Sequence, residues 1–233
     1  EQAQRVQDFM NYQVTSQITD YFNELDQMLF FLALSGSAFK KIYFDNTLDR
    51  ICSKFVPAEN FVISYENTDL ETADRYTQIM KISQNELKKH QISGFYRDIP
   101  LSKNEDDGKD QGTVEQTMQR LEGMTPSSAD KTHTLLEVHA DLDIGEDEDG
   151  LALPYIVTID YDTTQVLSIR RNWKEDDTLR KKVTYFIHYK YLPGLGFYGF
   201  GLIQSIGGLQ HASTGALRAL LDSAAFANLN GGF

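Results

Sequence analysis

Three glycines in the stretch "YKYLPGLGFYGFGLIQSIGG" have the spacing of a dinucleotide-binding turn. Gly194, Gly196 and Gly199 spell GxGxxG directly after a strand-like run. Such a turn holds the pyrophosphate of NAD or a related nucleotide, and it requires a parallel βαβ unit whose second strand ends in an acidic residue. Here Pro193 precedes the run, and Asp222 falls within a helical pattern. We therefore expect a structural loop, with a nucleotide-dependent enzyme as the alternative.

The expected loop joins a strand to a helix. Its glycines would permit positive φ angles, and its bulky aromatic side chains, Phe200 among them, would pack across the turn where a pyrophosphate would otherwise lie. The residues assigned to this glycine–aromatic loop are Gly194, Gly196, Phe197, Tyr198, Gly199 and Gly201.

An acidic run at residues 141–149 has the composition of a cation-binding loop. Calcium prefers several carboxylates on one loop, but an EF-hand also fixes their spacing. Placing Asp149 and Gly150 at the glycine step puts Gly145 at the first ligand position and Ile156 at the last. The spacing therefore favours a solvated hairpin tip, although weak cation binding stays open.

No other pattern of reactive side chains appears. The histidines lie far apart, with no partner cysteine and no HExxH spacing, although His139 and His188 could be neighbours across strands. Neither a GxSxG elbow nor a P-loop is present, so we expect no catalytic residue, no metal ligand and no cofactor. Cys52 is the single cysteine, which excludes an internal disulfide and indicates a packed strand residue in a reducing compartment.

The elements around these residues predict an α+β fold. Apolar residues recur at helical spacing over 3–34, and Ser35-Gly36-Ser37 ends that pattern. Strand-like runs follow, among them "AFKKIYFD", "RICSKFV" and "RYTQIMKIS". Ser83 and Glu86 form a capping box for the helix "QNELKKHQI". A long helix rich in small residues is expected over 201–228.

Composition suggests four segments. Residues 1–97 would form a helical entry plus a β-rich half, and 98–131 an acidic insertion or mobile loop. Residues 132–200 would form an antiparallel β meander, in which "YIVTID", "TQVLSIRRNW" and "KVTYFIHYKYL" pair as three consecutive strands, and 201–233 a C-terminal helix. In "HTLLEVHADLDI" the alternation places Leu135, Glu137 and His139 on one face.

The charge balance limits the partners. The chain has 233 residues and a formal net charge of -12, so a basic nucleic-acid-binding face is unexpected. Two basic pairs nevertheless stand out, and we assign them as DNA-facing residues: Lys40, Lys41, Arg170 and Arg171. The uncharged run from Tyr191 to Leu217 contains Pro193 and many glycines, which argues against a membrane span.

Long stretches of the chain resemble the portal proteins of short-tailed, double-stranded DNA bacteriophages. The stretches that carry the resemblance are "VQDFMNYQ", "LALSGSAFKKIYFD", "KFVPAENFVISY", "ISGFYRDIPL", "LPYIVTID", "LSIRRNWKEDD" and "YLPGLGFYGFGLIQSIGGL". They extend over nearly the whole chain in the same order, and the segment from Asp98 to Lys131 matches least. In that family the glycine–aromatic run precedes a helix and binds no nucleotide.

The resemblance implies a non-enzymatic structural protein. Portal subunits form a ring of twelve at one capsid vertex, through which a terminase motor packages the genome and from which the genome is later ejected. The implied partners are other copies of the chain, terminase, capsid or scaffold proteins, tail adaptor proteins and double-stranded DNA in transit, with no membrane. The implied location is the virion, and the host cytoplasm during assembly. A monomeric scaffold domain is a further alternative, and we expect the chain to be an interior section of a longer subunit.

Overall fold

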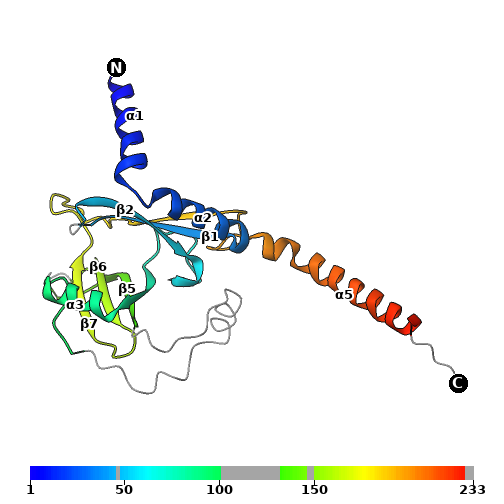
Figure 1. Ribbon diagram of the computed structural model, residues 1–233. Coiled ribbons are helices and arrows are strands. Elements are labelled where there is room, and N and C mark those ends of the chain that lie inside the picture. Colours follow the sequence, from blue (N-terminus) through cyan, green and yellow to red (C-terminus); the bar gives the residue numbers. More distant parts are fainter. Residues whose placement is uncertain (46–47, 101–131, 146–149, 229–233) are drawn as a thin grey trace. The chain divides into compact units, whose positions relative to one another are not determined.

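The computed structural model describes residues 1–45, 48–100, 132–145 and 150–228 (Figure 1). It confirms a mixed α+β fold with N-terminal helices, antiparallel sheets and a C-terminal helix. The chain divides into two compact units, described separately below. The first unit combines Glu1–Ala58, Asn67–Leu70 and Tyr185–Phe233, and the second combines Glu59–Glu66 and Glu71–Thr184. The four-part division expected from composition stays a prediction.

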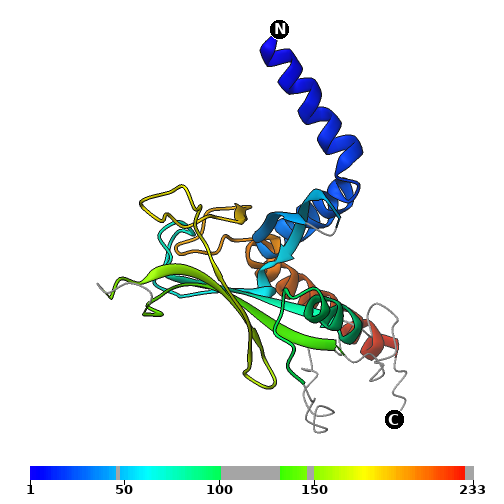
Figure 2. The same cartoon turned by 90° about the vertical axis from the view of Figure 1, so that its left-hand side faces the viewer.

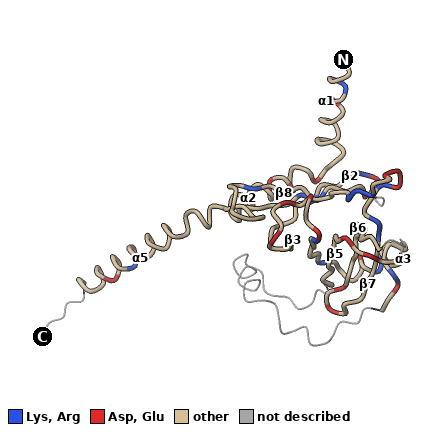
Figure 3. Tube along the Cα trace, turned by 180° about the vertical axis from the view of Figure 1, so that it is seen from behind, with Lys and Arg blue, Asp and Glu red and all other residues tan. Residues whose placement is uncertain are grey.

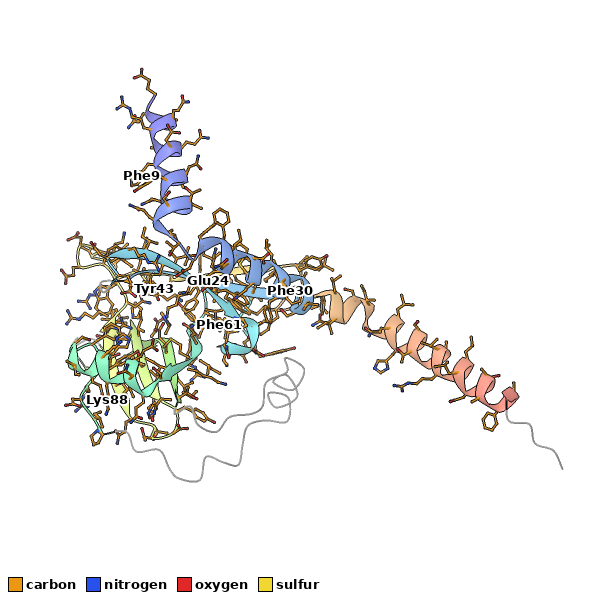
Figure 4. All side chains as sticks on the ribbon, viewed as in Figure 1. Phe9, Glu24, Phe30, Tyr43, Phe61 and Lys88 are labelled. Carbon is orange, nitrogen blue, oxygen red and sulfur yellow. The ribbon has the colours of Figure 1, made fainter. Side chains whose placement is uncertain are left out.

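The first unit begins with two helices, as the apolar spacing predicted. Helix α1 spans Gln2–Tyr12, a π-helical turn η1 follows at Gln13–Gln17, and α2 spans Tyr21–Ser35. Gly36 ends α2 in the left-handed region at φ 86°, which glycine adopts without a steric penalty. Helix α1 buries none of its residues, and Figure 4 shows Phe9 projecting from it.

A three-stranded sheet in the order β2-β1-β8 follows α2. Strand β1 is Ser37–Asp45, β2 is Arg50–Pro57 and β8 is Phe186–Lys190, and both pairings are antiparallel. Helix α2 packs on this sheet through the rings of Phe31 and Phe55, whose centroids lie 5.4 Å apart. The Glu24 carboxylate accepts from the backbone N–H of Phe55 at 2.6 Å and from Lys54 at 3.0 Å. A half-buried carboxylate that accepts two hydrogen bonds therefore joins α2 to the edge strand.

The second unit contains a five-stranded antiparallel sheet in the order β3-β4-β5-β6-β7. Its strands, which twist strongly in Figure 2, are β3 Phe61–Ile63, β4 Arg75–Ser83, β5 Thr132–Leu142, β6 Leu153–Asp160 and β7 Val166–Arg171. A short 3-10 turn, η2, precedes β3 at Ala58–Asn60, and α3 follows β4 at Gln84–Ile92. The Ser83 hydroxyl accepts from the Glu86 N–H at 3.3 Å, which confirms the predicted cap.

Leu87 of α3 packs into one cluster of this unit with Tyr96, Leu135 and Leu167. A separate cluster joins Leu153, Tyr155 and Val157, with the half-buried Trp173 against it. The second unit therefore has an apolar core of its own.

The expected three-strand meander is wrong in its third strand. Strands β6 and β7 pair as predicted, but β8 pairs with β1, where Phe39 lies opposite His188. The alternating pattern of "FIHYK" identified a strand correctly, since period two shows that a strand has two faces. It carries no information about which neighbour supplies the hydrogen bonds.

Helix α5 spans Leu202–Asn228, as expected from the apolar spacing. Figure 3 shows it almost free of charged residues, and Arg218 and Asp222 are its charged positions. Within the described residues, no helix is long and apolar enough to cross a membrane. The expected acidic insertion at 98–131 and the tip of the acidic run at 146–149 lie wholly or mainly outside the described residues.

Candidate functional site: the glycine junction at the base of α5

The loop between β8 and α5 meets the end of α2 through backbone hydrogen bonds. The N–H of Tyr191 donates to the carbonyl of Gly36 at 3.0 Å. Within the loop, the N–H of Leu192 donates to the carbonyl of Phe200 at 3.2 Å, and the N–H of Phe200 returns a bond of 2.9 Å. These bonds bring the two ends of the loop together beside the α2 terminus. We call this region, residues 191–201 with Gly36 and Ser37, the glycine junction.

Close backbone approach explains three glycines of the junction. A Cβ on Gly36 would collide with the backbone of Gly201 and Phe200, and a Cβ on Gly201 would collide with the Leu34 carbonyl. A Cβ on Gly199 would press on the Gly36 carbonyl. Because no side chain separates these segments, the end of α2 and the start of α5 lie against each other.

The predicted reason for these glycines was therefore wrong. Gly36 has a positive φ, but Gly194, Gly196, Gly199 and Gly201 do not. A Cβ on Gly194 would meet the Tyr198 carbonyl, so this glycine also serves a close approach. Gly196 has open space around its Cβ position and no constraint of either kind.

Ser37 links the loop to β1 and β8. Its residue is 2% exposed, and its hydroxyl accepts from the Gly199 N–H at 2.8 Å. The same hydroxyl lies 3.2 Å from Nε2 of His188. One buried oxygen thus satisfies a loop N–H and positions a ring on the neighbouring strand, which matters because a buried donor without a partner is costly.

Aromatic rings pack against one another in the glycine junction. The His188 ring stacks on Phe39 at 4.5 Å and on Phe197 at 4.4 Å between centroids, and Phe197 is 4% exposed. Tyr198 meets Phe39 edge-on at 6.5 Å. Burial, assisted by the nearby Lys190 ammonium, lowers the pKa of His188 from 6.5 to about 4. His188 is therefore a neutral ring at pH 7 and acts as a packing side chain.

This geometry contradicts the dinucleotide interpretation. The strand before the glycines is antiparallel to β1, and the described strands contain no parallel pair. Phe197 fills the loop from within, and the glycines are pressed against protein backbone. A pyrophosphate needs free N–H groups at a helix start after a parallel strand. Here the Gly199 N–H already donates to Ser37, and the Gly201 N–H donates to the Gln204 side chain.

The four basic residues assigned to DNA each lie over an aromatic ring. The Lys40 ammonium is 4.1 Å from the Tyr21 centroid, in a residue that is only 3% exposed, and burial lowers the pKa of Lys40 against the opposing effect of Glu24. The further ring contacts are Lys41 with Tyr43 and Phe186, Arg170 with Phe95, and Arg171 with Trp173. The lysines belong to the first unit and the arginines to the second, and Arg171 is the most exposed of the four.

Sequence reasoning missed a buried polar group in the second unit. Nε2 of His139 lies 2.9 Å from Oε1 of Glu137, and both residues are almost fully buried. Burial, together with the Glu137 charge, raises the pKa of Tyr96 to about 12. The alternation in β5 did place Glu137 and His139 on one face, but it gave no sign that the face is buried. His139 lies opposite Tyr76 and Ile156, so the suggested neighbour relation with His188 is wrong.

The described residues contain no group of three or more histidine, cysteine or acidic side chains arranged for a metal ion. Cys52 is buried and free on β2, as the strand pattern predicted. The described contacts of the glycine junction are thus packing contacts and hydrogen bonds within the protein.

Comparison with known families supplies the remaining finding. Residues 45–231 match the family model described as Phage SU10 portal protein. The match includes the last residue of β1, strands β2 to β8, helix α3, residues 191–201 of the glycine junction and helix α5, whereas Gly36 and Ser37 precede it. No curated protein matches the chain.

Proposed function

Because the chain belongs to the phage SU10 portal protein family, we propose that it is a section of a portal subunit that works as part of a ring through which the genome passes. The family match over 45–231 is the observation that carries this proposal. It supports a structural role in the virion, at the portal vertex of the capsid. The ring of twelve copies, the passage of DNA and the docking of terminase are the parts proposed here.

The described structure suits a role that depends on shape. The glycine junction holds the base of helix α5 against the end of α2. Among the described residues, no group of side chains is arranged to bind a metal ion. A portal works through pore diameter, wall charge and contacts between subunits. ATP hydrolysis then belongs to the separate terminase motor. The further partners proposed are capsid or scaffold proteins and tail adaptor proteins, with assembly in the host cytoplasm.

The charge of the chain supports weak, non-specific contact with DNA. A net charge of -12 keeps phosphate groups from binding tightly, which favours sliding. A DNA-facing role for the four basic residues stays a prediction, and the burial of their side chains limits which of them can contact DNA. Lys40 is too deeply buried to reach a phosphate, whereas Arg171 and the half-buried Lys41 have accessible surface.

The role of Arg171 in DNA passage is testable in phage particles. We expect Arg171→Glu to reduce packaged DNA, with Lys174→Glu, an exposed basic residue nearby, as the matched control. Equal amounts of packaged DNA in both variants and in the parent would show that Arg171 has no role in DNA passage.

The ring itself is tested on the complete gene product. Sedimentation velocity and negative-stain images should show a particle of many subunits with a central hole. A compact single particle at all concentrations would instead support a monomeric scaffold domain and contradict the proposal.

Saturable NAD or ATP binding abolished by Gly196→Ala would favour the nucleotide-dependent enzyme, and we expect no such binding.

A further inference from the structure

Helix α5 carries exposed large apolar side chains that nothing in the described part of the chain covers, and four of them form one stripe, with Ile203, Leu221 and Phe226 outside it. Ile206, Leu209, Leu217 and Leu220 follow one another at helical spacing, and we call this stripe the leucine face. Their residues are exposed by 47%, 72%, 60% and 67% respectively. Scattered exposed leucines are ordinary, but a stripe of this kind on one helix, here interrupted at Ser213, marks an interaction surface.

A second stripe on the same helix consists of small residues as far as Ala219 and ends at the exposed Phe226, seven positions further on. Gly208, Ala212, Gly215 and Ala219 are spaced by four, three and four positions, and we call this stripe the glycine face. With 3.6 residues per turn, it lies about 130° around the helix from the leucine face. A Cβ on Gly208 or Gly215 would meet no other atom within 4 Å. These glycines therefore serve no contact within the chain, although glycine lowers helix stability relative to alanine.

The two faces complement each other. One presents protruding side chains, and the other presents backbone that a neighbouring helix can approach closely, as ridges pack into grooves. Both are uncharged. The charged residues of the helix, Arg218 and Asp222, lie together with His211 in the wider sector between the two faces, outside both stripes. No like charges would therefore meet if the two faces came together.

We propose that the leucine face of α5 in one copy of this chain packs against the glycine face of α5 in the next copy. This inference rests on the proposed portal function, and it names the surfaces through which neighbouring subunits meet. A head-to-tail contact of this kind uses two different faces on every subunit, and it forms a ring when the rotation between neighbouring copies closes on itself.

The complementarity favours this occupant over a two-fold pairing. If two leucine faces met symmetrically, the glycine faces of both copies would stay uncovered, and the small residues would remain unexplained. The glycine junction also supports the proposal, because it fixes the base of α5 in the first unit. Every copy therefore presents its two faces in the same orientation.

Cysteine cross-linking in the complete subunit tests the contact. In a double variant Leu217→Cys/Ala219→Cys, the two cysteines lie on different faces and point apart within one helix, so they cannot bond internally. Mild oxidation should produce a ladder of disulfide-linked multimers on a non-reducing gel. The matched control is Leu209→Cys/Leu217→Cys, which places both cysteines on the leucine face and should give no ladder beyond that of the parent.

Each other outcome contradicts the proposal in a different way. Cross-linking in the control alone would indicate a two-fold pairing of leucine faces. An intact ring without cross-links in the test variant would indicate that another element of the longer subunit covers α5. If the parent forms no ring, the proposed portal function fails together with this inference.

A substitution that adds bulk provides a second readout. We expect Ala219→Leu to fill the glycine face and convert the ring to smaller species in sedimentation velocity, with the helical circular dichroism signal preserved. Arg218→Leu is the matched control, because it adds an apolar side chain in the sector outside both faces, and its ring should persist. A ring that persists equally in both variants would overturn the pairing.

Discussion

The two ends of α5 lie in opposite environments. At its base, Gly201 meets backbone atoms directly, and Phe197 and Ser37 beside it are almost fully buried. Beyond the first turns, every described residue from Gly208 to Ala227 is exposed. Within the described residues, only the base of α5 is buried against other elements of the chain.

This difference separates two uses of small residues. In the glycine junction, glycines allow the chain to pack against itself, and adding a Cβ causes a collision. Along the body of α5, glycines have empty space around them. Fixed packing at one end and uncovered apolar surface along the rest is the arrangement expected of a helix that is directed by its own subunit and covered by another molecule. Three pairs of substitutions and one pH measurement test this contrast.

The largest difference is expected between two apolar truncations. Phe197→Ala should lower the free energy of unfolding by about 4 kcal/mol, because it removes a buried ring that stacks on both Phe39 and His188. Leu217→Ala should change it by less than about 0.5 kcal/mol, because the side chain is exposed. Denaturant unfolding of the 233-residue chain measures both. Similar losses would mean that α5 is covered within its own chain.

The next difference concerns added methyl groups. Gly201→Ala should cost about 3 kcal/mol, because the new Cβ displaces the Leu34 carbonyl and the Gly36 backbone. Gly215→Ala should instead stabilise the chain by about 0.5 to 1 kcal/mol, through helix propensity alone. The opposite signs in one unfolding experiment would confirm the contrast. If Gly201→Ala left the free energy of unfolding unchanged, the backbone segments around Gly201 would not be in close contact.

A smaller effect is expected from hydroxyl removal. Ser37→Ala leaves the buried Gly199 N–H without its acceptor and should cost about 2 kcal/mol. Ser213→Ala, on the exposed body of α5, should lie within about 0.5 kcal/mol of the parent. If the two serines proved equivalent, Ser37 would not link the loop to β1.

An effect that is absent at pH 7 and seen only at acidic pH is the pH dependence contributed by His188. Its pKa is about 4 in the folded chain and 6.5 without the surrounding protein, so between these values the unfolded state binds more protons than the folded state. Stability should therefore fall as the pH decreases from 6.5 to about 4, and this contribution should level off below. His188→Gln should show a shallower loss over that range than the parent. Equal slopes would indicate that His188 is not shielded from solvent.

The sequence predicted most elements of the fold, because their signals are local. The limits of β4, the Ser83 cap and the end of α2 at Gly36 follow from alternation, capping chemistry and backbone freedom. The partner of β8 did not follow, because hydrogen bonding between distant strands leaves no mark in the pattern of one strand. The loop before α5 was predicted as structural, but the reason for its glycines depends on Leu34 and Gly36, which lie far away in the sequence.

The resemblance to portal proteins was confirmed by the family match, whereas the basic residues show the limit of composition. Lys40 and Lys41 are adjacent in the sequence, yet one is buried under Tyr21 and the other is half-buried on the opposite side of the strand. Alternation on a strand separates neighbours in this way. A pair of basic residues on a strand therefore does not make a basic patch.

Hydrogen exchange along α5 in the 233-residue chain tests the central contrast most directly. Amides in the first turns, near the glycine junction, should exchange slowly, and those from Gly208 onward should exchange faster by a large factor, because an isolated helical segment in water is only marginally stable. In the ring of complete subunits, the whole helix should become protected. Uniform slow exchange along α5 in the 233-residue chain, with no further protection in the complete protein, would contradict the account.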